Sequence, residues 1–234
     1  MFDSIDEARK ILTVLIDSLE RKGEFPHADE VRDMITALQQ LVDIVAAVDE
    51  QGKVLTPEEI TDIGAQGLQL IDELAFKLAS QQLESERQDV EQVALVLARW
   101  VIAHQGTLTN IQSIVNAFAY LSNAVHDKAT LAQLAAFAGQ VAHACSDAIK
   151  QDVDNSNPMR PWRILHLNRG IVATRSHELE LMRRVYAELI EAIPMDAPGF
   201  FKEGMSEMEH LNYPSPVREL MQEFYARTTL PSVH

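Results

Sequence analysis

Helix-start signals recur at nearly equal intervals along this chain, and they constrain its fold more than any other feature of the sequence. Each signal is a Ser, Thr or Pro that precedes a stretch in which apolar residues return every three or four positions. The signals lie about 52 residues apart, at Ser4, Thr56, Thr109 and Pro161. Runs that alternate β-branched and polar residues, which are typical of half-buried strands, are nearly absent. The sequence therefore predicts an all-α fold.

Each interval holds two helices and a short connection, which is the arrangement of an antiparallel helix hairpin. The interval exceeds the 34 residues of tetratricopeptide repeats and the roughly 40–47 residues of HEAT and armadillo repeats. We expect the hairpins to stack as a short superhelix or as a closed bundle, and their similar lengths favour the superhelix. Gly64 and Gly67 flank the apolar face of the third helix and would let a neighbouring helix approach closely. About nine helices are predicted, near residues 5–22, 27–48, 57–78, 88–104, 110–125, 128–150, 161–193, 198–211 and 216–228.

The chain of 234 residues is long enough to bury a large core within one domain. We therefore expect a single all-helical domain over residues 1–234. The polar, proline-closed segment QDVDNSNPMRP is the best linker in the sequence. It offers an alternative division into a hairpin stack at 1–151 and a C-terminal helical part at 158–234.

Composition narrows the range of partners. The formal charge is −15, with 20 Lys and Arg against 35 Asp and Glu, which argues against nucleic acid as a partner. No apolar run reaches the roughly 18 residues that span a bilayer, so we expect no membrane insertion. The acidic N-terminus lacks the features of a secretory signal, and the single cysteine, Cys145, cannot form an internal disulfide. The expected location is cytoplasmic.

The predicted helix at 161–193 is the longest, and its polarity conflicts with its geometry. At about 100° of rotation per residue, one face collects an apolar stripe, yet Asn168 and Arg175 fall inside it. A buried guanidinium needs an acceptor, because an unpaired buried charge costs several kcal/mol. The stripe consists of Ile164, Ile171, Val172, Leu179, Met182, Tyr186, Leu189 and Ile193.

Two hypotheses account for Arg175. In the first, Arg175 and Asn168 line a groove with Arg163 and His177, and the groove receives a carboxylate or a phosphate. In the second, Arg175 is clamped within the protein, which is the usual state of a buried charge. The candidate carboxylates for this clamp are Asp147, Glu203 and Glu207.

Signals for metal binding or catalysis are weak. Glu207 and His210 have the Glu-x-x-His spacing of carboxylate-bridged metal sites, and Glu203 lies one turn earlier. A second such pair on a helix is missing, so a solvated acidic face explains these residues better, and no cofactor is expected. No phosphate-binding loop, nucleophile elbow or zinc-protease motif occurs, so no catalytic residue is assigned.

Three functions follow as expectations. The leading one is a non-enzymatic helical interaction or adaptor protein that binds a basic or amphipathic protein or peptide, because the chain is acidic and regularly helical. The second is a small-anion binding protein or enzyme that uses Arg163, Asn168, Arg175 and His177. The third is a metal-dependent helical-bundle enzyme. The alanine-rich helix at 128–150 adds the expectation of a homo-oligomer.

Overall fold

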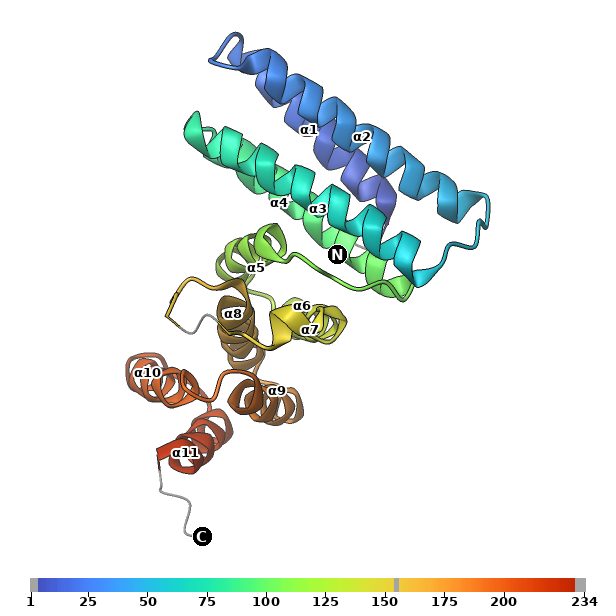
Figure 1. Cartoon of the computed structure of the whole chain (residues 1–234). Coiled ribbons are helices and arrows are strands. Elements are labelled where there is room, and N and C mark those ends of the chain that lie inside the picture. The colour runs from blue at the N-terminus through green and yellow to red at the C-terminus, as the bar shows by residue number, and fades with distance from the viewer. Residues whose placement is uncertain (1–3, 154–155, 230–234) are drawn as a thin grey trace. The chain divides into compact units, whose positions relative to one another are not determined.

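The structure, a computed structural model, describes residues 4–153 and 156–229 (Figure 1). Within these ranges the chain forms eleven helices and no strand, which confirms the predicted all-α fold. None of the described helices is both long and apolar enough to cross a bilayer. The helices are α1 (Ile5–Lys22), α2 (Ala28–Glu50), α3 (Pro57–Ser80), α4 (Glu84–Ala103), α5 (Gln112–Ala124), α6 (Lys128–Ala144), α7 (Asp147–Lys150), α8 (Pro161–Ser176), α9 (Leu179–Ala192), α10 (Ala197–His210) and α11 (Ser215–Thr229).

The chain gathers into two compact units. Unit 1 comprises residues 1–120 and 143–149, and unit 2 comprises residues 121–142 and 150–234. The boundaries fall within α5 and near the end of α6, whereas the predicted linker lies at 151–161. The single domain at 1–234 and its alternative division stay predictions.

In unit 1 the first four helices form a closed bundle. Helix α1 packs against α2 and α4, and α3 packs against the same two helices, so the four close a ring (Figure 1). A Cβ atom on Gly64 would lie 2.5 Å from Val101 Cγ2. One on Gly67 would lie 2.5 Å from Leu97 Cδ2. The two glycines thus permit the close approach of α4 to α3 that the sequence predicted.

The predicted helix at 128–150 ends earlier than expected. Leu108 N–H donates to the carbonyl of Ala144 over 2.8 Å, and Ser146 N–H donates to the carbonyl of Leu108 over 2.9 Å. This isolated bridge, which pairs Leu108 with Cys145, takes the amide of Ser146 out of the helical pattern. The helix therefore stops at Ala144, and α7 is a separate turn of helix.

The prediction of a single long helix at 161–193 is wrong. The chain breaks at His177, which adopts left-handed backbone angles (φ 63°, ψ 14°), and α9 begins two residues later. The hydroxyl of Ser176 accepts the Glu178 amide at 3.2 Å, which stabilises the turn. Helices α8 and α9 then pack against each other, so one stripe cannot continue through both.

The core of unit 2 is built around an aromatic cluster. Tyr186 of α9 is fully buried, and its ring meets Phe200, Phe201 and Phe224 edge to face with centroids 5.1–6.0 Å apart. The hydroxyls of Tyr186 and Thr174 share a hydrogen bond of 2.6 Å, so the buried phenol has a partner. These contacts fix α8, α10 and α11 relative to one another within unit 2.

Candidate functional site

A hollow of about 280 Å³ lies in unit 2 between α8, α10, the segment that follows α10, and α11. We call it the α10 groove. Apolar side chains of α8, α10 and α11 form its wall and floor, and its charged side chains come from α8 and α10. The residues that line it are Ile171, Thr174, Arg175, Phe200, Glu203, Gly204, Glu207, Met208, Leu211, Tyr213 and Met221.

Local backbone structure shapes the groove. A Cβ atom on Gly204 would lie 2.9 Å from Met221 Sδ, so glycine lets α10 and α11 approach closely at the floor. Helix α10 ends at His210, and Leu211 adopts an extended conformation (φ −105°, ψ 128°). The amide of Tyr213 then donates to the carbonyl of Leu211 over 2.6 Å. This turn presents Leu211 and Tyr213 to the groove before α11 begins.

The groove exposes apolar side chains at its margins. Ile171 on α8 is 43% exposed and Leu211 after α10 is 50% exposed. Ile171 was expected in the buried stripe, and that placement is wrong. The buried face of α8 instead includes Trp162, Leu165 and Arg169, which follow one another at intervals of three and four residues. Ile171 consequently faces outward and forms one wall of the groove.

Two carboxylates border the groove on α10. Glu203 and Glu207 are one helical turn apart, and both are exposed. Neither has an ion-pair partner in the part of the chain that the structure describes. Two other acids of unit 2 are engaged, since Glu188 pairs with Arg169 and Asp196 pairs with Arg163. The groove thus combines apolar surface with free negative charge.

Arg175 borders the groove at α8, where its partner differs from the expected carboxylate. Its guanidinium donates to the backbone carbonyls of Ser122 and Val125, the second over 2.7 Å. The Nη2 atom also lies 3.3 Å from Nδ1 of His126. These carbonyls belong to the C-terminal end of α5, where free acceptors and the helix dipole attract a cation. Arg175 is therefore held within the protein, by partial charges instead of an acid.

Tyr213 lies close to charges of both signs. Burial is the largest cause that raises its pKa, and the negative charge of Glu207 raises it further, while the positive charge of Arg175 opposes them. The net effect keeps the phenol neutral at pH 7, so its hydroxyl can donate a hydrogen bond. The ring centroid lies 5.2 Å from that of His177.

His177 supports Tyr213 and does not line the groove. Burial, followed by the positive charge of Lys128, lowers the pKa of His177. The imidazole is therefore neutral at pH 7. Its buried Nδ1 atom has no hydrogen-bond partner within residues 4–153 and 156–229. His177 thus contributes ring packing behind the groove.

The other two candidate anion ligands lie apart from this end of α8. Arg163 Nε donates to Asp196 Oδ1 over 2.7 Å, and its Nη1 donates to the carbonyl of Pro158 over 2.8 Å. Arg163 precedes Arg175 by twelve positions, which is about 18 Å along the helix axis. The buried Nδ2 atom of Asn168 has no hydrogen-bond partner among the described residues. Arg163, Asn168, Arg175 and His177 do not converge on one hollow, and anion binding by them stays a prediction.

The deeply buried arginine of α8 is Arg169, whose burial was not predicted from the sequence. It is 3% exposed, and its guanidinium pairs with Glu188 of α9. Its Nε donates to the carbonyl of Ala135 over 3.1 Å, and a Cβ atom on Gly139 would lie 2.6 Å from its Nη2. Arg169 follows Trp162 by seven residues, or about two helical turns, so the two side chains lie on the same face of α8. This spacing is the sequence signal for the burial of Arg169. The expectation of a buried, paired arginine thus fits Arg169.

The three weak metal-ligand candidates are not gathered. Glu203 and Glu207 line the groove, whereas Nδ1 of His210 lies 2.8 Å from the carbonyl of Ser206 in its own helix. No group of three or more His, Cys, Asp or Glu side chains in the described ranges is arranged to hold a metal ion.

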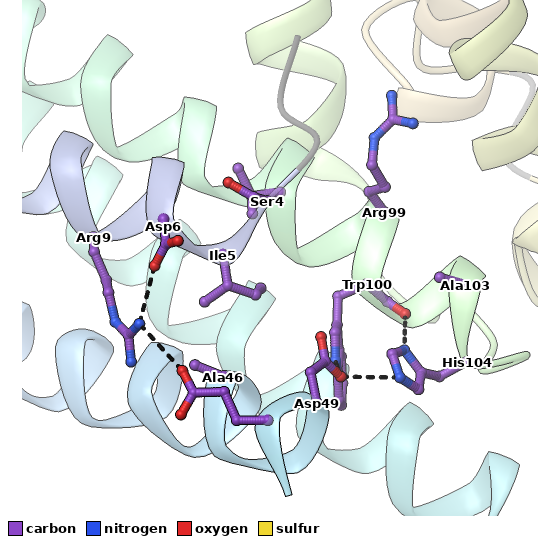
Figure 2. Close-up of a pocket in the computed structure, with 12 residues that line it drawn as sticks. Ser4, Ile5, Asp6, Arg9, Ala46, Asp49, Arg99, Trp100, Ala103 and His104 are labelled. Atoms are coloured by element: carbon purple, nitrogen blue, oxygen red, sulfur yellow. Dashed lines mark hydrogen bonds and ion pairs between the residues drawn. The ribbon is translucent and has the colours of Figure 1, made fainter. Parts of the chain in front are cut away.

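A second hollow, of about 320 Å³, lies in unit 1 at one end of the bundle. Figure 2 shows Asp49, Trp100 and His104 together on one side of it, and Arg9 with Asp6 on the other. Asp49 Oδ1 accepts a hydrogen bond from Trp100 Nε1 at 3.0 Å and lies 3.0 Å from His104 Nε2. His104 Nδ1 faces the carbonyl of Trp100 at 2.9 Å. Both ring nitrogens thus have partners, so this imidazole offers no free base to a substrate.

Chemically, the α10 groove can bury apolar groups and attract cations, while Asp49, Trp100 and His104 of the unit 1 hollow bind one another. Neither holds a nucleophile next to a free base, the arrangement that covalent catalysis requires. Comparisons of the chain with models of protein families, with curated proteins and with solved structures found no match.

Proposed function

We propose that this protein is a non-enzymatic interaction protein that binds a helical segment of a partner protein or peptide in the α10 groove. The observation that carries the proposal is the exposure of Ile171 and Leu211 beside a hollow with an apolar floor. Exposed apolar surface around a concavity is typical of sites that bury part of a partner.

The size and lining of the groove suit side chains of a helix. An apolar cavity of about 150 Å³ holds a benzene ring, so about 280 Å³ has room for roughly two apolar side chains. An amphipathic helix presents such pairs three or four residues apart. Met208 and Met221 of the floor are flexible and can adapt to side chains of different shape.

The proposal is tested by titrating the protein into a fluorescently labelled amphipathic peptide of about 18 residues and measuring anisotropy. We expect saturable binding, and we expect Leu211→Ser to weaken it about fivefold, because the loss of an apolar contact that a partner covers costs about 1 kcal/mol. Phe76→Ser is the matched control, since Phe76 is 75% exposed on α3 and lines neither hollow. Equal losses in the two variants, or no saturation in the millimolar range, would contradict the proposal.

A further inference from the structure

The unpartnered charge of the α10 groove specifies the chemistry of its partner. Glu203 and Glu207 border the groove, are exposed, and have no ion-pair partner among the described residues. Helix α10 carries one lysine and three glutamates, so its own cations cannot neutralise them. An occupant without positive charge would leave both carboxylates beside newly buried apolar surface, which is unfavourable.

The spacing of the two carboxylates sets the spacing of the cations. Residues four apart on a helix lie on one face with Cβ atoms about 5–6 Å apart. A partner helix that lies along α10 reproduces this separation when its own cations are also four residues apart. Arg175 borders the same groove from α8 and disfavours a third cation on that side.

We infer that the partner of the α10 groove is a basic amphipathic helix that sets two Lys or Arg side chains, one helical turn apart, against Glu203 and Glu207. This inference rests on the proposed function and adds the charge and register of the partner. The apolar side chains of the helix fill the groove, and its two cations lie at the edge over α10, where water still reaches them. Such pairs at the edge of an interface select partners more than they add affinity.

The test uses three labelled peptides that share one apolar face and differ at two positions, i and i+4, which carry Lys/Lys, Gln/Gln or Glu/Glu. At low salt we expect the Lys/Lys peptide to bind about tenfold more tightly than the Gln/Gln peptide, and the Glu/Glu peptide to bind most weakly. A fourth peptide with its lysines at i and i+2, on different faces of the helix, should lose this advantage.

Protein variants assign the effect to the two carboxylates. In Glu203→Gln/Glu207→Gln the preference for Lys/Lys over Gln/Gln should fall to less than about twofold. The control Glu58→Gln/Asp62→Asn removes two exposed acids at the same spacing from α3 and changes the net charge equally. It should retain the preference, which separates local pairing from long-range attraction.

Each outcome has a definite meaning. If the peptides bind regardless of charge and Leu211→Ser weakens them all, the groove binds helices but the inferred pairing is wrong. If the control variant loses the preference as fully as the α10 variant, the overall charge of the protein selects the peptide and the inference is again wrong. If no peptide binds, both the proposed function and the inference are wrong.

Discussion

The hollow of unit 1 and the α10 groove are similar in size and differ in how their acidic side chains are paired. In unit 1, Asp49 bonds Trp100 and faces His104, and Arg9 pairs with Asp6 and Asp43. In unit 2, Glu203 and Glu207 lack partners among the described residues, and apolar side chains at the same groove are exposed. Volume therefore does not distinguish the two hollows, and our proposal rests instead on unpaired carboxylates that lie next to exposed apolar side chains.

The difference has a structural origin. The first four helices close a ring in which each has two neighbours, and their exposed apolar side chains, such as Val14, Ile44 and Phe76, line neither hollow. In unit 2, α10 packs mainly against α11, and α8 buries the face that holds Trp162 and Arg169, which leaves Ile171 exposed. Three experiments test this difference between the two units.

The largest expected effect is a loss of stability when the ion pair between Arg169 of α8 and Glu188 of α9 is removed. Arg169→Met leaves Glu188 without its partner and should destabilise unit 2 by about 3–5 kcal/mol, measured as a free energy of unfolding in urea. Adding Glu188→Leu should recover part of this loss, because no unpaired carboxylate then remains. A loss below about 1 kcal/mol in the single variant would show that the pair does not hold α8 and α9 together.

A smaller effect, with a pH dependence, separates paired acids from free ones. Burial raises the pKa of Asp196, but hydrogen bonds from Arg163 and Arg160 outweigh it, so the net pKa is lowered. The carboxylate therefore stabilises the fold above its unfolded pKa of about 3.9, and this contribution is lost as the pH falls through the folded value.

Asp196→Asn should accordingly lower the free energy of unfolding by about 1–3 kcal/mol at pH 7, and the gap should narrow as the pH falls through the lowered folded pKa of Asp196. Glu203→Gln should change stability by less than about 0.5 kcal/mol at pH 7, because no partner is lost. A similar loss in the two variants would remove the distinction between paired and free acids.

The smallest effect tests the hollow of unit 1. Asp49→Ala removes the acceptor for Trp100 and should destabilise unit 1 by about 1 kcal/mol, since the carboxylate is 42% exposed and partly screened by water. Affinity for the Lys/Lys peptide should not change. Weaker peptide binding in this variant would connect the hollow of unit 1 with recognition and undermine the comparison.

The sequence predicted helices well and their endings less well. Capping residues and apolar periodicity are local signals, and α3 begins as predicted at Thr56, whose side chain forms a complete capping box with Glu59. The end of α6 depends on hydrogen bonds with Leu108, far away in the chain. The turn after α8 contains no Gly, Pro or Asn, so His177 gave no local signal for a break.

The candidate site was only partly accessible from sequence. Arg175, Glu203 and Glu207 were all singled out, but as an anion ligand, a clamp or a weak metal site. Their role at the edge of a groove depends on the contact of α10 with α11, which no spacing in the sequence encodes. The exposure of Ile171 and Leu211 could not be predicted from the sequence either, because it depends on whether tertiary packing places a neighbour against the side chain.

The most direct test of the central claim is hydrogen–deuterium exchange of the whole protein with and without saturating Lys/Lys peptide. We expect slower exchange in residues 203–213 and 171–176, which border the α10 groove, and no change in residues 46–50 and 99–104 of unit 1. Protection confined to unit 1, or no protection while the peptide is bound, would contradict binding in the α10 groove.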